Sequence, residues 1–189
     1  MRSVMILVTG LPGSGKSVFS DVARSLCIPV VTLGDVVREE VSRRGLEPTL
    51  ENIMSIAQEL RNSHGLAAIA MMALGRIRES LRYSCVVVVD GVRSLEEVNY
   101  LKSEVEATTI LVAIHASPLT RFRRLISRGR SGDPKNWDEF VERDLRELSW
   151  GLGNVIALAD VVFVNEGSVD EFKKCVNEFL TEVKRKWCT

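Results

Sequence analysis

The sequence lacks both an excess of charge of one sign and a long apolar run. Lys and Arg together count 25, as do Asp and Glu, so the net charge at neutral pH is zero. This balance excludes the strong overall positive field that draws proteins to DNA or to anionic lipid. The first apolar run, VMILV, is far too short to cross a bilayer. We therefore expect a cytoplasmic protein that binds neither membrane nor DNA.

Cysteine is also scarce, and its spacing does not suggest a metal site. No C-x-x-C pair occurs, which argues against a zinc knuckle or a redox dithiol. We expect the four cysteines to be buried thiols, and they are Cys27, Cys85, Cys175 and Cys188.

Linkers and low-complexity segments are missing too. A chain of 189 residues with 46% hydrophobic content suits one compact α/β domain, 1–189, and has no room for a second large one. That disfavours a two-lobed helicase or motor. Five short β-branched runs, each typical of a strand covered on both faces, alternate with amphipathic helical segments. The runs are 4–10, 28–34, 85–91, 108–116 and 159–167. The pattern predicts a doubly wound, five-stranded parallel sheet whose ligands bind beyond the carboxyl ends of the strands.

The first strand ends in a glycine-rich segment, VTGLPGSGKS, that fits the full G-x-x-x-x-G-K-[ST] pattern. In this pattern backbone N–H groups cradle phosphates, Lys16 reaches the outer phosphates and the Ser17 hydroxyl binds Mg²⁺. We therefore predict that the chain binds ATP with Mg²⁺. The predicted ATP-binding residues of this segment are Gly10, Leu11, Pro12, Gly13, Ser14, Gly15, Lys16 and Ser17.

The second and third strands end in further polar residues. TLGDVVREE places Asp35 and Arg38 about one helical turn apart, and VVVVDGVRS places Asp90 at the end of a buried strand, followed by Arg93. Asp90 suits a Mg²⁺ ligand that acts through water. Two arginines in addition to Lys16 suggest a second phosphate. The alternatives are that Asp35 caps a helix and that both arginines are solvated surface charges.

These two segments resemble parts of the adenylate kinases. TLGDVVRE is similar to their STGDxLR segment, and VVVVDGVRS to their DGFPRT segment, although the latter is one residue shorter here. The resemblance implies that Arg38 and Arg93 bind the phosphate of an acceptor nucleoside monophosphate. It also places the following residues in the acceptor site: Thr32, Gly34, Asp35 and Gly91.

Two further resemblances cover more of the chain. Nearly all of it resembles a family of archaeal P-loop proteins described as related to adenylate kinases, within the nucleoside monophosphate kinase group. The last predicted strand, ADVVFVNEGS, resembles the closing strand of dephospho-coenzyme A kinases. The chain departs from the dephospho-coenzyme A kinases after the second predicted strand, where it has TLGD in place of their acidic D-x-D segment.

An arginine-rich segment predicts a mobile lid at about 121–146, beside a helical acceptor region at about 33–82. Arg121, Arg124 and Arg128 recur on one helical face, and GRSGDP makes a flexible break before the next helix. The resemblance to the kinases implies that Arg124 and Arg128 act in catalysis and that Arg130 and Arg143 bind ATP. The alternative is a solvated basic helix.

The leading hypothesis is therefore an ATP-dependent, Mg²⁺-requiring kinase whose acceptor is a nucleoside monophosphate such as AMP. Transfer to a phosphate needs no strong base, but transfer to a sugar hydroxyl needs one, and Asp35 is the carboxylate that we nominate for that role. Coenzyme A precursor phosphorylation is the nearest enzymatic alternative. A second class of hypothesis is a nucleotide-sensing ATPase that works with a protein or ribonucleoprotein partner.

Overall fold

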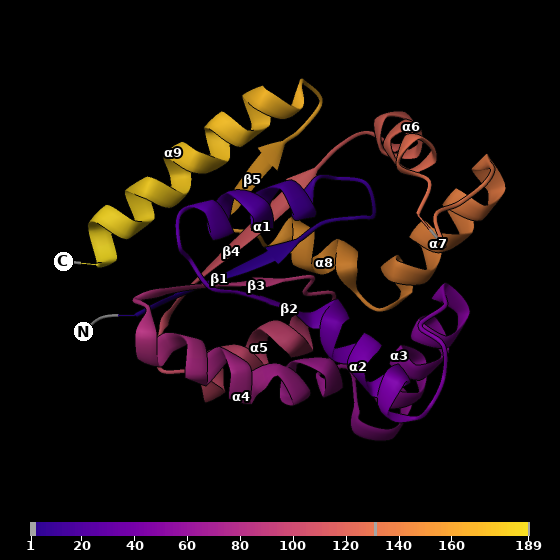
Figure 1. Cartoon of the computed structure of the whole chain (residues 1–189), viewed down its shortest axis with the longest axis horizontal. Helices are drawn as coiled ribbons and strands as arrows, with labels where there is room; N and C mark the ends of the chain where they lie inside the picture. Colours follow the sequence, from indigo (N-terminus) through magenta and orange to yellow (C-terminus); the bar gives the residue numbers. More distant parts are fainter. Residues whose placement is uncertain (1–2, 131, 189) are drawn as a thin grey trace.

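Five apolar segments pair side by side into one parallel sheet, as the sequence predicts (Figure 1). The structure is a computed structural model that describes residues 3–130 and 132–188, so residue 131 of the predicted lid lies outside the description. The strands are β1 (Val4–Thr9), β2 (Val30–Thr32), β3 (Val86–Asp90), β4 (Thr108–His115) and β5 (Val161–Val164). Their spatial order is β2-β3-β1-β4-β5. This arrangement confirms the doubly wound α/β fold.

Helices cover both faces of the sheet (Figure 1). Helices α1 (Lys16–Ser25) and α9 (Val169–Trp187) pack on one face. The other face is covered by α2 (Leu33–Arg43), α4 (Ala68–Tyr83), α5 (Leu95–Glu104) and α8 (Leu152–Ala157). Helix α3 (Leu50–His64) packs on α2 and α4. Helices α6 (Pro118–Arg128) and α7 (Trp137–Ser149) lie beyond the carboxyl ends of the strands. The polar segments that follow the strands therefore face α6 and α7.

The strand register brings three predicted site segments together. Val8 near the end of β1 pairs with Asp90 at the end of β3, and Thr32 at the end of β2 pairs with Asp90 from the other side. Because all strands run the same way, the glycine-rich segment after β1 lies at the same edge as Asp90.

The strands differ in how fully they are covered. Every residue of β1 and β3 is buried, as expected for central strands between two helical layers. In β5, Val162 and Val164 remain exposed, so the expectation of cover on both faces is wrong for this edge strand. Within the described ranges, each helix is too short or too polar to span a membrane.

Side-chain caps fix the starts of the helices near the site. Ser117 caps α6 directly before Pro118, and Asn136 caps α7. Ser94 caps α5 by accepting the Glu97 N–H at 3.1 Å. The Glu97 carboxylate, in turn, accepts the N–H of Arg93 at 2.6 Å, so it holds the backbone that carries this predicted site residue.

The expectation of buried thiols is wrong. Cys85, which precedes β3, forms a disulfide with Cys188 at the end of α9, across a sequence separation of 103 residues. Cys27 and Cys175 are free and exposed. Sequence spacing could not show the disulfide, because only the packing of α9 along the sheet brings its two cysteines together.

We expect the disulfide to stabilise the fold by restricting the unfolded chain. A loop of about 100 residues gives up to about 4.7 kcal/mol in the chain-entropy model, and measured values are typically about 2–4 kcal/mol. Reduction, or the substitution Cys188→Ser, should therefore lower the melting temperature by roughly 5–15 °C. Calorimetry measures this change, with Cys175→Ser on the same helix as the control. An unchanged melting temperature in reductant would contradict the prediction.

Candidate active site

The segment between β1 and α1 forms a loop that only glycine permits at three positions. Gly10, Gly13 and Gly15 have φ angles of 147°, 81° and 117°. A Cβ on Gly13 would also lie 2.8 Å from the backbone oxygen of Arg121. The side chain of Asn165, directly after β5, donates to the Ser14 backbone oxygen at 2.7 Å and supports the loop from the adjoining strand end.

Lys16, the first residue of α1, folds back over this loop. Its ammonium donates to the backbone oxygens of Gly10 and Leu11. Burial lowers the pKa of Lys16 from its ordinary value, while the nearby charges of Glu147 and Asp90 oppose that change. A cation held by backbone carbonyls over a glycine-rich loop is suited to bind phosphate oxygens, which are stronger acceptors than the carbonyls.

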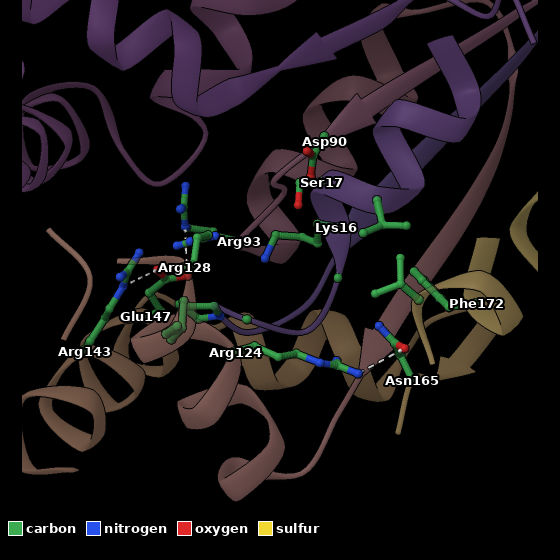
Figure 2. Close-up of a pocket in the computed structure, with 16 residues that line it drawn as sticks. Lys16, Ser17, Asp90, Arg93, Arg124, Arg128, Arg143, Glu147, Asn165 and Phe172 are labelled. Carbon is green, nitrogen blue, oxygen red and sulfur yellow. Dashed lines mark hydrogen bonds and ion pairs between the residues drawn. The ribbon is translucent and has the colours of Figure 1, made fainter. Parts of the chain in front are cut away.

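A cavity of about 350 Å³ opens beside the loop (Figure 2). It extends from Lys16 and the cations around it to an apolar end near α9, so its shape and chemistry suit a molecule with a charged and an apolar part. Its lining residues include Gly13, Gly15, Lys16, Ser17, Val18, Asp90, Arg93, Arg124, Arg128, Arg143, Glu147, Asn165, Val169 and Phe172.

Asp90 and Ser17 have the properties expected of a Mg²⁺ site. Asp90 accepts from the Ser20 hydroxyl at 2.9 Å through Oδ2, whereas its buried Oδ1 has no hydrogen-bond partner among the described residues. Ser17 is exposed, and Figure 2 shows its side chain next to that of Asp90. A carboxylate and a hydroxyl are oxygen ligands of the type that Mg²⁺ prefers, and Oδ1 is an acceptor that no described residue uses.

A second cavity, of about 200 Å³, adjoins the first and contains both predicted acceptor arginines, Arg38 and Arg93. Gly34 also lines it. Its opposite wall is apolar and comes from α2, α3 and the segment between them, with Val37, Pro48, Leu50, Ile53, Met54 and Ala57. The cavity therefore combines cations on one side with a hydrophobic surface on the other.

Three other residues predicted for the acceptor site lie elsewhere. Thr32 and Asp35 line a separate cavity on the side of α4, together with Arg76. Asp35 forms an ion pair with Arg38, its neighbour one turn along α2. Gly91 lines neither the first nor the second cavity, and its φ of 96° lets the chain turn sharply after β3. The helical phase of α2 explains the separation of Asp35 from Gly34, since consecutive residues on a helix point in different directions.

The arginines of the predicted lid have different environments. Arg121 is buried and pairs with Asp144 at 2.6 Å. Although it shares a helical face with Arg124 and Arg128, its role is to pack α6 against α7. Arg124 lines the first cavity and donates weakly to Asn165 at 3.4 Å. Arg128 and Arg143 line both cavities, and both pair with the buried carboxylate of Asp133. Arg130, predicted to bind ATP, lines the second cavity.

Glu147 is the site residue that sequence reasoning missed most clearly. Its side chain, on α7, is only 3% exposed and lines both cavities. It accepts from Arg93 Nε at 3.2 Å and lies 4.0 Å from Arg143 Nε (Figure 2). Burial would raise the pKa of Glu147, but the positive charges of Arg93, Lys16 and Arg143 outweigh burial and lower it. This carboxylate is therefore ionised at neutral pH.

Trp150, just after α7, is a second missed residue. Its ring forms part of the second cavity, and the guanidinium of Arg61 lies 4.3 Å from the ring centroid. Its Nε1 donates to Gln58 at 2.8 Å. These contacts from α3 hold the indole rigidly. In the sequence, Trp150 and Glu147 had no signal beyond an ordinary amphipathic pattern.

Comparison with known proteins supports the fold and places the chain among relatives. A family model described as AAA domain matches residues 9–141. A UPF0200 protein of Hyperthermus butylicus is 51% identical over 180 residues, which cover 95% of each chain. A UPF0200 protein of Methanocaldococcus jannaschii is 49% identical over 93% of this chain and 86% of its own length.

Solved structures agree with the observed architecture. A shikimate kinase from Bacteroides thetaiotaomicron aligns with a TM-score of 0.59 and 20% identity, over 94% of this chain and 98% of its own. A gluconokinase from Sinorhizobium meliloti aligns with a TM-score of 0.56 and 19% identity, over 98% of this chain and 97% of its own. At these identities the likeness shows a shared fold.

Asn165 provides a test of how the loop is supported. Asn165→Ala would leave the Ser14 backbone oxygen without its donor, at a cost of about 1–3 kcal/mol. We expect the dissociation constant for ATP to rise about tenfold, measured by isothermal titration calorimetry. Asn177→Ala, at an exposed position of α9, is the control and should leave the affinity unchanged. Equal ATP affinity in the Asn165 variant and the wild type would show that the loop does not need this support.

Proposed function

This chain belongs to the AAA domain family and to the family of UPF0200 proteins, and we propose that it is an ATP-dependent small-molecule kinase. Its acceptor is a molecule with a nucleoside monophosphate unit, of which AMP is the simplest. The observation that carries the proposal is the pair of adjoining cavities that share Arg93, Arg128 and Arg143. One cavity holds the phosphate-binding loop, and the other combines arginines with an apolar wall.

The first cavity is the proposed donor site. The loop 10–17 would bind the triphosphate, with Lys16 on its outer phosphates. The apolar end of this cavity, formed by Val18, Val169 and Phe172, offers a surface for the nucleoside. Arg124 lies between these two parts of the cavity, where its guanidinium can contact both the base and a phosphate (Figure 2).

Mg²⁺ would be bound with the nucleotide at Ser17 and, through water, at Asp90. The ion would neutralise charge on the phosphates during transfer. The protein's own contribution is to orient the phosphate chain and to exclude water from it.

The second cavity is the proposed acceptor site. Arg38 and Arg93 would bind the phosphate of the nucleoside monophosphate unit, since guanidinium groups bind phosphate in a bidentate manner. The base would pack against Ile53 and Met54 of α3 and near Trp150. A small polyhydroxy acid would gain little from such a wall, because it has no apolar surface to bury. This argument favours a nucleotide over a sugar acid.

The lid arginines complete the proposal. Arg128 and Arg143 line both cavities, so they can contact charge that moves from one to the other. We assign the segment 121–146 as the lid and 33–82 as the acceptor region on this basis. Asp133 pairs with both arginines, and incoming phosphates would compete with it.

The proposed activity is tested by incubating the protein with [γ-³²P]ATP, Mg²⁺ and a set of nucleotides. The set comprises AMP, the other nucleoside monophosphates and dephospho-coenzyme A, with shikimate and gluconate as contrasting acceptors. The proposal predicts labelled product with at least one nucleotide and much less with the two acids. Hydrolysis of ATP at one rate regardless of the acceptor would contradict a kinase and favour a nucleotide-sensing ATPase.

A substitution of Arg38 tests the proposed acceptor site separately from the proposed donor site, because Arg38 lines the second cavity but not the first. Arg38→Ala removes a charge-assisted contact worth about 1.5–3 kcal/mol. We expect KM for the acceptor to rise about 10- to 100-fold while Kd for ATP stays the same. Arg76→Ala is the control: Arg76, on α4, pairs with the exposed Glu39 of α2 and lines neither of the two cavities. An unchanged acceptor KM would exclude Arg38 from the site.

A further inference from the structure

Two kinds of oxygen on a nucleotide can accept a phosphoryl group, namely a phosphate oxygen and a sugar hydroxyl. The difference matters for the protein, because a hydroxyl carries a proton that must leave during transfer, whereas a phosphate oxygen is already ionised. A site built for a hydroxyl therefore needs a carboxylate or another base where donor and acceptor meet.

Glu147 lies at this meeting point. Among the carboxylates of residues 3–130 and 132–188, it alone lines both the donor and the acceptor cavity. Asp90 lines only the first and Asp133 only the second. Asp35, nominated from the sequence as the base, lies in neither.

The hydrogen bonding of Glu147 leaves it able to accept a proton. A carboxylate can accept about four hydrogen bonds. Oε2 accepts one from Arg93 at 3.2 Å, while Oε1 lies 4.0 Å from Arg143 Nε, beyond hydrogen-bond distance. The side chain is ionised and enclosed, and Arg93 fixes its orientation. A ligand hydroxyl can therefore donate to Oε1 without displacing the Arg93 contact.

The charges around the second cavity also favour a hydroxyl. Arg93 pairs with Glu147, Arg128 and Arg143 pair with Asp133, and Arg38 pairs with Asp35, so Glu147 is the carboxylate that stands where the two cavities meet. A phosphate that received the γ-phosphoryl group here would have to lie against Glu147, with repulsion between the two anions. A hydroxyl in the same place would instead gain a hydrogen bond.

We propose that Glu147 is the catalytic base of this kinase and that the accepting atom is a hydroxyl oxygen of the nucleotide-like acceptor. The inference rests on the proposed function. The acceptor oxygen bonds to the γ-phosphorus as the bond from that phosphorus to the β,γ-bridging oxygen breaks. ADP leaves, and the hydroxyl proton passes to the Glu147 carboxylate. The acceptor's own phosphate stays on Arg38, which lines the second cavity and not the first, and the product is a phosphate monoester.

The identity of the product bond gives the first test. The wild-type protein is incubated with ATP, Mg²⁺ and either AMP or dephospho-coenzyme A, and the products are examined by ³¹P NMR. The proposal predicts a new phosphate monoester resonance on one of these acceptors, without conversion of AMP to ADP. Conversion of AMP to ADP would overturn the hydroxyl inference and leave the proposed kinase function intact. Failure to transfer to these two acceptors and to every other nucleoside monophosphate, with ATP bound, would contradict the proposed function itself.

Variants of Glu147 give the second test. Glu147→Gln keeps the shape of the side chain but cannot accept the proton, so kcat should fall at least about 100-fold while KM for the acceptor changes less than about threefold. Glu147→Asp should recover part of the lost kcat. Glu142→Gln, an exposed carboxylate on the same helix, is the control and should retain wild-type kcat.

ATP affinity separates a catalytic effect from a structural one. Both Glu147 variants should bind ATP at least as tightly as the wild type, because a negative charge near Lys16 is removed or kept without change to the loop. A Glu147→Gln protein that binds ATP normally and keeps kcat within threefold would overturn the assignment of the base. Because Glu147→Gln leaves Arg93 without its carboxylate partner, its melting temperature should fall, and a cooperative transition well above the assay temperature shows that the variant is folded.

Discussion

Charge balance at the carboxyl edge of the parallel sheet is the constraint on which the rest of the site depends. The topology brings the ends of β1, β2 and β3 to one edge, and with them Lys16 and Arg93. Burying such cations without partners is costly. Glu147 of α7 meets this requirement by lying among Lys16, Arg93 and Arg143. The packing of α7 over the strand ends is thus tied to the charges that the strands carry there.

This balance explains why the cavities adjoin. Arg93 follows β3, while Arg128 and Arg143 come from α6 and α7, and all three lie where the two cavities meet. Phosphates entering the cleft would replace carboxylates and carbonyl oxygens of the same chain as partners of these cations. Binding therefore exchanges one set of ion pairs for another inside a partly enclosed site. The internal ion pairs hold the arginines in position, and the phosphates of a ligand would set their final arrangement.

Much of the fold and the conformation of the glycine-rich loop could be predicted from the sequence, because the signals are local. The loop needs positive φ at Gly10, Gly13 and Gly15, which a glycine pattern reveals directly. The continuous apolar runs in the sequence predict the strands of the parallel sheet, and β1 and β3 are fully buried. That Arg38 and Arg93 line the same cavity was also predictable, because the segments that carry them both resemble segments of the adenylate kinases.

The parts that could not be predicted depend on contacts between distant elements. Glu147 and Trp150 belong to an ordinary amphipathic segment, and only the position of α7 against α3 and β3 gives them their roles. Thr32 and Asp35 were carried into the acceptor site by resemblance, but both line the cavity beside α4, Thr32 from the end of β2 and Asp35 through the phase of α2. The Cys85–Cys188 disulfide likewise needs the path of α9 along the whole sheet.

The central claim is that two nucleotide-binding cavities are filled together. Calorimetric titration of AMP into protein saturated with Mg²⁺ and a non-hydrolysable ATP analogue tests it most directly. The account predicts that AMP binds with a stoichiometry of about one while the analogue stays bound, since the loop and the Arg38 cavity are separate. Loss of AMP binding at saturating analogue would show a single nucleotide site and contradict the account.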